Sequence, residues 1–244
     1  MSSGVHVAIV FDESSGLGAA TAMTLRKRGA VVIAAGPDAS VFDDDVVFVQ
    51  TDWTDEVQVA RVCSIAAQHG SVRSVVTISG LSTSRRLVDR SGAVHPLADF
   101  ERTVQHGLSG PFNVLRLVAS AIGANEPDAN GERGVIVNTA SVSAFDGQVG
   151  QVAYSAAKGG VVAMTLPAAR DLAPMGIRVC AIAPGLFATP KAAQLSASIV
   201  RSVPQPERLG YPEEFADLVG HIVGNPYLNG EVIRLDGGLR LPPK

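Results

Sequence analysis

Residues 5–18, VHVAIVFDESSGLG, set the architecture that the rest of the chain extends. Val5–Phe11 is a continuous apolar run of strand length, and helical spacing of apolar residues begins after Gly18. A strand that passes through a tight glycine turn into a helix directs backbone N–H groups and the positive end of the helix dipole at one spot. The turn therefore indicates an anion site, although two glycines alone fit an ordinary strand-to-helix turn equally well.

The remaining sequence repeats this alternation of strand and helix without an internal repeat or a linker. The strand-length runs are apolar on both faces, which is typical of a parallel sheet covered by helices on each side. We therefore expect an α/β fold in a single domain, residues 1–244. The expected strands are Val5–Phe11, Val31–Ala35, Val46–Val49, Val72–Ile78, Gly134–Thr139, Ile177–Ala183 and Glu231–Leu235. The expected helices are Gly16–Arg28, Asp55–His69, Leu97–Ala124, Gln151–Leu172 (bent or shortened by Pro167) and Pro212–Val223.

The composition excludes several classes of protein. Hydrophobic residues make up 46% of the chain and charged residues 18%, which excludes disorder. The net charge of −3 argues against nucleic acid or an anionic membrane as a partner. Cys63 and Cys180 are too few for a disulfide framework, and the histidines lack the paired spacing of a metal site. With no secretory signal and no apolar stretch of ~20 residues, we expect a cytoplasmic protein without a metal.

Tyr154 and Lys158 lie four residues apart in an expected helix, so their side chains share one face. A neighbouring ammonium favours the tyrosinate and is expected to lower the pKa of the Tyr154 phenol. Ser141 follows the fifth expected strand, where its hydroxyl can hold an alcohol or carbonyl oxygen beside Tyr154. A Tyr-x-x-x-Lys spacing alone is common on solvated helix faces, but together with Ser141 and the glycine turn it indicates acid–base chemistry.

Over its full length the chain resembles the short-chain dehydrogenase/reductase family. The segments that carry the resemblance are Ser14–Gly18, Asn138–Ser141, Tyr154–Lys158, Ile182–Gly185 and Leu235–Gly238. Longer runs such as GQVGQVAYSAAKGG (147–160) and NGEVIRLDGG (229–238), and the extra segment Ser82–His95, resemble the 3-hydroxyacyl-CoA dehydrogenase type II branch, also called 17β-hydroxysteroid dehydrogenase type 10.

The resemblance implies a Rossmann-type doubly wound parallel sheet of about seven strands, in the order 3-2-1-4-5-6-7. It also implies a NAD-linked oxidoreductase, with NADP not excluded, that interconverts a secondary alcohol and a ketone, such as 3-hydroxyacyl-CoA and 3-ketoacyl-CoA, as a homotetramer. Tyr154 would be the general acid/base, Lys158 would lower its pKa and bind the nicotinamide ribose, and Ser141 would position the substrate oxygen. The positions that match cofactor contacts are Ser15, Gly16, Leu17, Gly18, Asp52, Trp53, Ile78, Gly80, Tyr154, Lys158, Pro184, Gly185, Phe187 and Thr189.

Departures from the family pattern keep a second interpretation open. The family's Thr-Gly is Phe11-Asp12 here, and the Asp12 carboxylate would repel phosphate if it points inward but cost little if it faces solvent. The family's Asn-Asn-Ala-Gly is Thr77–Gly80, and its catalytic Asn falls on Gly107, beside a His106 expected to face elsewhere. The alternative is therefore a degenerate relative with weak or no nucleotide binding that serves as a scaffold or binding subunit.

Three further features carry open alternatives. The family's acidic residue at the end of the second strand falls on Gly36, but Asp38 follows and no basic residue is present, which favours NAD. Trp53 either walls the adenine or anchors a surface contact. The arginines of the extra segment either meet the phosphates of a CoA ester or form a solvated loop; they are Arg85, Arg86 and Arg90.

Overall fold

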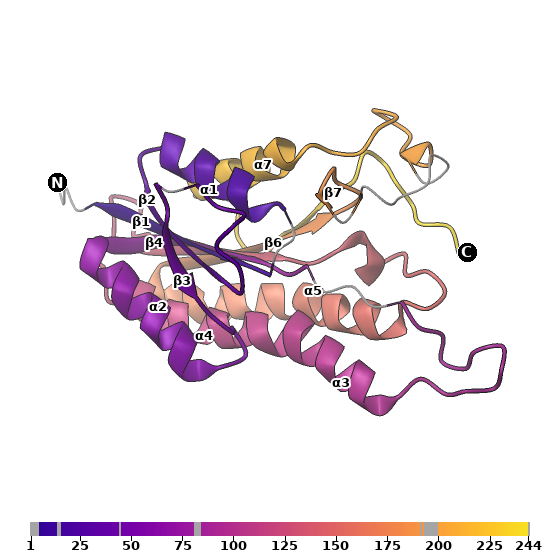
Figure 1. Ribbon diagram of the computed structural model, residues 1–244. Coiled ribbons are helices and arrows are strands. Elements are labelled where there is room, and N and C mark those ends of the chain that lie inside the picture. The colour runs from indigo at the N-terminus through magenta and orange to yellow at the C-terminus, as the bar shows by residue number, and fades with distance from the viewer. Residues whose placement is uncertain are drawn as a thin grey trace.

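The computed structural model describes residues 5–13, 16–43, 45–80, 84–190, 192 and 200–243. Seven strands form one parallel sheet in the order β3-β2-β1-β4-β5-β6-β7 (Figure 1), which confirms the order implied by the resemblance. The strands are β1 (His6–Asp12), β2 (Val31–Gly36), β3 (Val47–Gln50), β4 (Ser71–Ile78), β5 (Gly134–Thr139), β6 (Ile177–Pro184) and β7 (Val232–Leu235).

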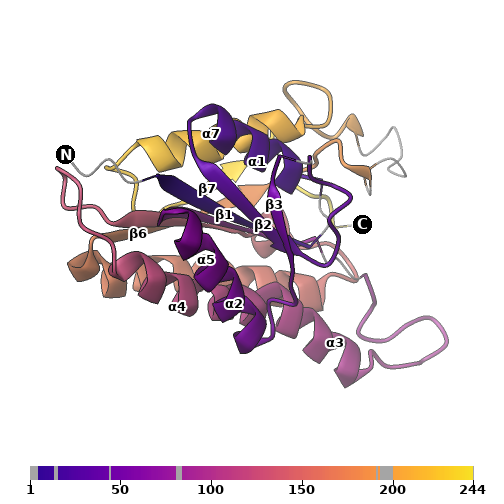
Figure 2. The same ribbon diagram turned by 60° about the vertical axis from the view of Figure 1, so that its left-hand side comes forward.

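Helices cover both faces of the sheet (Figures 1 and 2). α1 (Gly18–Lys27) and α7 (Pro212–Gly224) lie together on one face, while α2 (Glu56–His69), α4 (Gly110–Gly123) and α5 (Val152–Leu172) lie on the other. Alternate side chains of β1 enter the two cores: Ile9 packs on the side of α2 and α4, and Val10 on the side of α1 and α7. This double burial explains why the strands are apolar on both faces.

Parallel pairing brings the carboxyl ends of the strands to one edge of the sheet. Asp12 is in register with Ile78, and Thr139 with Ile182. β1 lies between β2 and β4, so the chain leaves β1 and β4 toward opposite sides of the sheet and opens a crevice between them. The glycine turn and the end of β5 therefore both border this crevice.

One helical expectation is wrong, and one of two alternatives for Pro167 is excluded. The single helix expected over Leu97–Ala124 is divided into α3 (Leu97–Val104), a π-helical turn (Gln105–Ser109) and α4. Pro167 does not shorten its helix, because α5 continues for 21 residues with the proline inside it. The loss of one backbone hydrogen bond at a proline is tolerated where the helix is held by packing on both sides of it. None of the described helices is both long enough and apolar enough to cross a membrane.

Candidate active site

Asp12 points into the glycine turn, which settles the question of its orientation. Its side chain is 2% exposed, and its Oδ2 accepts a hydrogen bond from the backbone N–H of Gly18 at 3.1 Å. A Cβ atom at Gly18 would lie 2.3 Å from that oxygen, so the first residue of α1 has to be glycine. The carboxylate thus accepts the hydrogen bond of a backbone N–H group at the helix N-terminus, and a bound phosphate would use this same donor.

The described residues of the turn after Glu13 begin at Gly16. Gly16 adopts a φ of 84°, in the left-handed region that favours glycine. The Leu17 side chain is buried, and its carbonyl oxygen accepts hydrogen bonds from the backbone and the hydroxyl of Thr21. Ser15, expected to contact the cofactor, lies outside the described residues.

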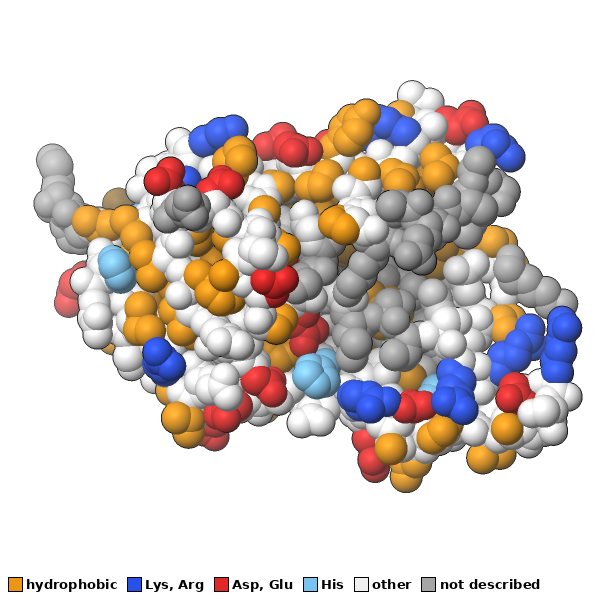
Figure 3. Space-filling model, viewed as in Figure 1, with side chains coloured by type: hydrophobic (Ala, Val, Ile, Leu, Met, Phe, Trp, Pro, Cys, Tyr) orange, Lys and Arg blue, Asp and Glu red, His pale blue; other side chains and the backbone are white. Residues whose placement is uncertain are grey.

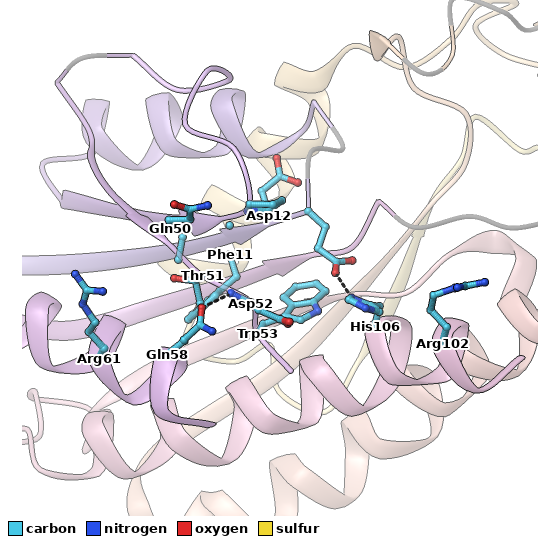
Figure 4. Close-up of a pocket in the computed structure, with 14 residues that line it drawn as sticks. Phe11, Asp12, Gln50, Thr51, Asp52, Trp53, Gln58, Arg61, Arg102 and His106 are labelled. Atoms are coloured by element: carbon cyan, nitrogen blue, oxygen red, sulfur yellow. Dashed lines mark hydrogen bonds and ion pairs between the residues drawn. The ribbon is translucent and has the colours of Figure 1, made fainter. Parts of the chain in front are cut away.

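A cavity of about 660 Å³ lies beside the ends of β1, β2 and β3 (Figure 4). Trp53 is part of its wall and is only 4% exposed, so the surface-anchor alternative for this residue is wrong. The indole packs against Gly110, where a Cβ atom would lie 2.5 Å from its Nε1. Asp52 also lines the cavity, but its Oδ1 accepts hydrogen bonds from the backbone and the hydroxyl of Thr54.

A second cavity, of about 160 Å³, lies beside Tyr154, which forms part of its wall. It is lined by side chains that come from the glycine turn, the ends of β4, β5 and β6, and α5. The expected site residues in its wall are Leu17, Ile78, Gly80, Tyr154, Pro184, Gly185, Phe187 and Thr189. The fold therefore brings together residues that lie up to 172 positions apart (Leu17 to Thr189) in the sequence.

Lys158 is fully buried one turn from Tyr154. Its ammonium donates a hydrogen bond to the Thr139 carbonyl oxygen at 2.8 Å and lies 5.9 Å from the centre of the Tyr154 ring. Burial lowers the pKa of Lys158 to about 8, although the negative charge of Glu13 acts in the opposite direction. Since burial disfavours a charge without a close counter-ion, this ammonium is poised to release or share a proton.

The pKa of Tyr154 is shifted in the opposite direction to the one expected from its neighbour Lys158. Burial raises the pKa of its phenol, and a hydrogen bond with Ser141 only partly offsets that effect. The desolvation of the tyrosinate therefore outweighs the lowering expected from Lys158. Ser141 begins the short 3-10 turn Val142–Ala144, where its Oγ accepts a hydrogen bond from the backbone N–H of Ser143 at 3.1 Å.

Glu13, His106 and Ser79 form a cluster that the sequence did not predict. His106 Nδ1 and Glu13 Oε1 are 2.9 Å apart, and the Ser79 hydroxyl donates to Glu13 Oε2 at 3.1 Å. His106 faces a different neighbour from the adjacent Gly107, as expected: its ring contacts Glu13, whereas a Cβ atom on Gly107 would lie beside Ala157. The one available signal was an acidic residue, Glu13, in the glycine turn.

Gly107, the position of the family's catalytic Asn, lies in the π-helical turn. It is buried, and a Cβ atom on it would lie 2.9 Å from the Ala157 Cβ. This close approach to α5 leaves no room for a larger side chain unless one of the two helices shifts. The helix irregularity is therefore retained without the side chain that the family places there.

Comparisons with known proteins show that this chain is similar to dehydrogenases over nearly its full length. The model of the short chain dehydrogenase family matches residues 6–199. The 3-hydroxyacyl-CoA dehydrogenase type-2 of Homo sapiens is 48% identical over 250 residues, which cover 97% of this chain and 96% of the relative. The relative of the same name from Drosophila melanogaster is also 48% identical, over 97% of this chain and 98% of its own.

Two crystal structures extend the similarity to three dimensions. The structure of 3-hydroxyacyl-CoA dehydrogenase type-2 from Mycobacterium avium has a TM-score of 0.94 at 42% identity and covers 98% of this chain and 97% of its own. The structure of 3-ketoacyl-(acyl-carrier-protein) reductase from Brucella melitensis complexed with NADH has a TM-score of 0.81 at 25% identity, with 97% and 98% covered. The resemblance noted in the sequence is thus confirmed, and this chain belongs to the short-chain dehydrogenase family of oxidoreductases.

Proposed function

We propose that residues 1–244 form one domain that uses NAD(H) to interconvert a secondary alcohol and a ketone, with 3-hydroxyacyl-CoA as the substrate class. The observation that carries the proposal is the cavity in which Tyr154 stands one helical turn from a buried Lys158, at the carboxyl edge of the sheet. The substrate class is supported by the 48% identity to 3-hydroxyacyl-CoA dehydrogenases type-2. We further propose a cytoplasmic homotetramer.

The two cavities fit the two halves of a dinucleotide. The larger one, between Gly36 and Trp53, would take the adenosine, and the smaller one, beside Tyr154, the nicotinamide. Ile78 and Gly80 would contact the nicotinamide half from β4, and Pro184 and Thr189 from the end of β6 and the loop after it. The fit is incomplete at one point, because the Glu13 carboxylate stands between the cavities and would have to move.

The side chains can carry the proton chemistry of such a reaction. When bound, the nicotinamide supplies the hydride acceptor or donor. Ser141 holds the alcohol oxygen of the substrate, and Tyr154 Oη takes its proton as the carbonyl forms. The Lys158 ammonium stabilises the tyrosinate form of Tyr154 that accepts this proton, and it would contact the nicotinamide ribose from the same position. In the reverse direction Tyr154 returns the proton to the developing alkoxide.

Basic side chains gather at one end of the molecule, over α3 and the loop before it (Figure 3). Arg85, Arg86 and Arg90 are all exposed in this loop. The Arg85 guanidinium lies 2.9 Å from the Asp99 carboxylate on α3, which ties the loop to the helix. We propose that these arginines meet the phosphates of a CoA ester, because guanidinium groups bind phosphate through paired hydrogen bonds.

The variant Tyr154→Phe tests the function. NAD⁺-dependent oxidation of 3-hydroxybutyryl-CoA, followed by absorbance at the NADH band, should fall by ~10²–10⁴-fold in kcat, the range for loss of a general acid/base. The control Tyr227→Phe alters a side chain that is 98% exposed and should retain full activity. Near-normal turnover in Tyr154→Phe would remove Tyr154 from the mechanism. Absence of any thermal shift with NAD⁺, NADH, NADP⁺ or NADPH would instead favour a scaffold role, since bound nucleotide at a hundredfold excess over Kd adds ~2.7 kcal/mol of stability.

A further inference from the structure

We propose that Glu13 and His106 form a latch across the crevice, which a dinucleotide must displace before its nicotinamide end can reach Tyr154. The proposal rests on the proposed function and adds a residue that controls how tightly the nucleotide binds. It concerns two side chains of this chain, neither of which was among the expected catalytic or cofactor-binding residues.

The latch is anchored at the backbone of Glu13 and held at its carboxylate by contacts with His106 and Ser79. The backbone N–H of Glu13 donates to the Ile78 carbonyl oxygen at 3.0 Å, which continues the pairing of β1 with β4 by one residue. Displacing the carboxylate therefore requires rotation of the side chain and loss of its contacts with His106 and Ser79, but no change in the backbone. That side chain is 16% exposed and the His106 side chain 31% exposed, so both reach the surface of the crevice.

The carboxylate stands at the junction of the two cavities. Glu13 and His106 both line the larger cavity, where the dashed line to His106 in Figure 4 marks their 2.9 Å contact. Ser79, which donates to the other carboxylate oxygen at 3.1 Å, lines the smaller cavity. A ligand that extends from Trp53 to Tyr154 has to pass this carboxylate.

The charge of the latch opposes the ligand that the crevice is proposed to take. A dinucleotide carries its negative diphosphate in the middle, between adenosine and nicotinamide, and two anions within a few ångströms repel strongly in a partly desolvated site. Asp12 already accepts the hydrogen bond of the Gly18 N–H, so a second carboxyl group lies at the same turn. Once Glu13 has turned away, the His106 imidazole is left facing the crevice, where its N–H can donate to the diphosphate.

Calorimetric titration of the full chain tests the latch without any measurement of turnover. We expect the Kd for NAD⁺ to fall by about tenfold or more in Glu13→Gln and in Glu13→Ala, because both variants remove the repelling charge. The control Glu213→Gln removes a charge from an exposed position in the first turn of α7 and should leave the Kd within twofold of the wild type. Adenosine is the matched ligand, because it is uncharged and fills only the larger cavity; its Kd should not change in the Glu13 variants.

The outcomes separate the latch from the proposed function. Measurable NAD⁺ binding by the wild type with an unchanged Kd in both Glu13 variants overturns the latch and leaves the function standing. An equal gain for adenosine also overturns it, because the substitution would then have loosened the whole pocket. Binding of NAD⁺ by the Glu13 variants but not by the wild type supports the latch in its strongest form. Failure of every protein to bind NAD⁺ or NADH overturns the function and the latch together.

Discussion

The buried ammonium of Lys158 makes the stability of this protein depend on pH in a way that can be measured. The side chain has no exposed surface, and its ammonium donates a hydrogen bond to the Thr139 carbonyl oxygen at 2.8 Å. Burial lowers the pKa of Lys158 from 10.5 to about 8. Lys158→Met keeps most of the side-chain volume and removes the titrating group, so the difference between wild type and variant isolates this one residue.

The direction in which stability changes with pH depends on whether the folded or the unfolded chain holds the Lys158 proton more tightly. Between pH 8 and pH 10.5 the unfolded chain keeps the Lys158 proton while the folded chain has released it, so the free energy of unfolding rises with pH. The penalty for burying the charge is fully present below pH 8 and disappears as the pH approaches 10.5. At ~1.4 kcal/mol per pKa unit, the whole penalty is about 3 kcal/mol, of which about 1 kcal/mol is recovered between pH 7 and pH 9.

Urea denaturation followed by circular dichroism at pH 7, 8 and 9 gives the required free energies. The stability of the wild type relative to Lys158→Met should increase by about 1 kcal/mol from pH 7 to pH 9. Parallel curves for the two proteins would refute the reasoning, because they would show that the Lys158 pKa is the same in the folded and unfolded states. A relative decrease would show that a counter-ion raises this pKa instead.

Three further predictions follow from close contacts in and around the crevice. Asp12→Gly should lower the Kd for NAD⁺ by ~10- to 100-fold in calorimetry, because it frees the Gly18 N–H and removes one buried charge; an unchanged Kd would show that Asp12 does not oppose the ligand. Gly110→Ala should cost ~1–3 kcal/mol in urea denaturation, because its Cβ would lie 2.5 Å from the Trp53 ring, whereas Gly159→Ala, with no atom within 4 Å, should stabilise α5 by up to ~1 kcal/mol. Equal effects of these two alanines would contradict the packing argument. Ser141→Ala should reduce kcat by ~10²-fold or more with little change in melting temperature, since it removes a donor to the reacting oxygen; a change in KM alone would assign Ser141 to binding only.

The succession of strands and helices along the chain could be predicted because the expected strands are apolar on both faces. The order of the strands within the sheet was implied instead by the family resemblance. Val5–Phe11 has no polar face, and this pattern with intervening helices leaves a parallel sheet as the consistent solution. The π-helical turn could not be predicted, because its residues keep an apolar spacing that fits one continuous helix. Gly107 in this turn lies close to Ala157, and this approach of two distant segments is not encoded in local spacing.

In the site, the positions of the motif residues could be predicted, but the directions and partners of some side chains could not. The positions of Tyr154, Lys158 and Gly185 follow from where the strands end, and the structure places Tyr154 and Gly185 around one cavity. The direction of the Asp12 side chain and the partner of Glu13 do not follow from sequence, because a turn side chain adopts the rotamer that its tertiary neighbours permit. The raised pKa of Tyr154 was missed for a related reason, since burial is a property of the packed fold.

The packing of Trp53 has a practical consequence for spectroscopy. Trp53 is the single tryptophan of the chain, so all indole emission reports one position. Because this ring is buried in the core and also forms a wall of the larger cavity, its emission maximum should respond to unfolding and its intensity to occupation of the crevice. Energy transfer from this ring to a reduced nicotinamide would give the separation of the two groups without any label being attached.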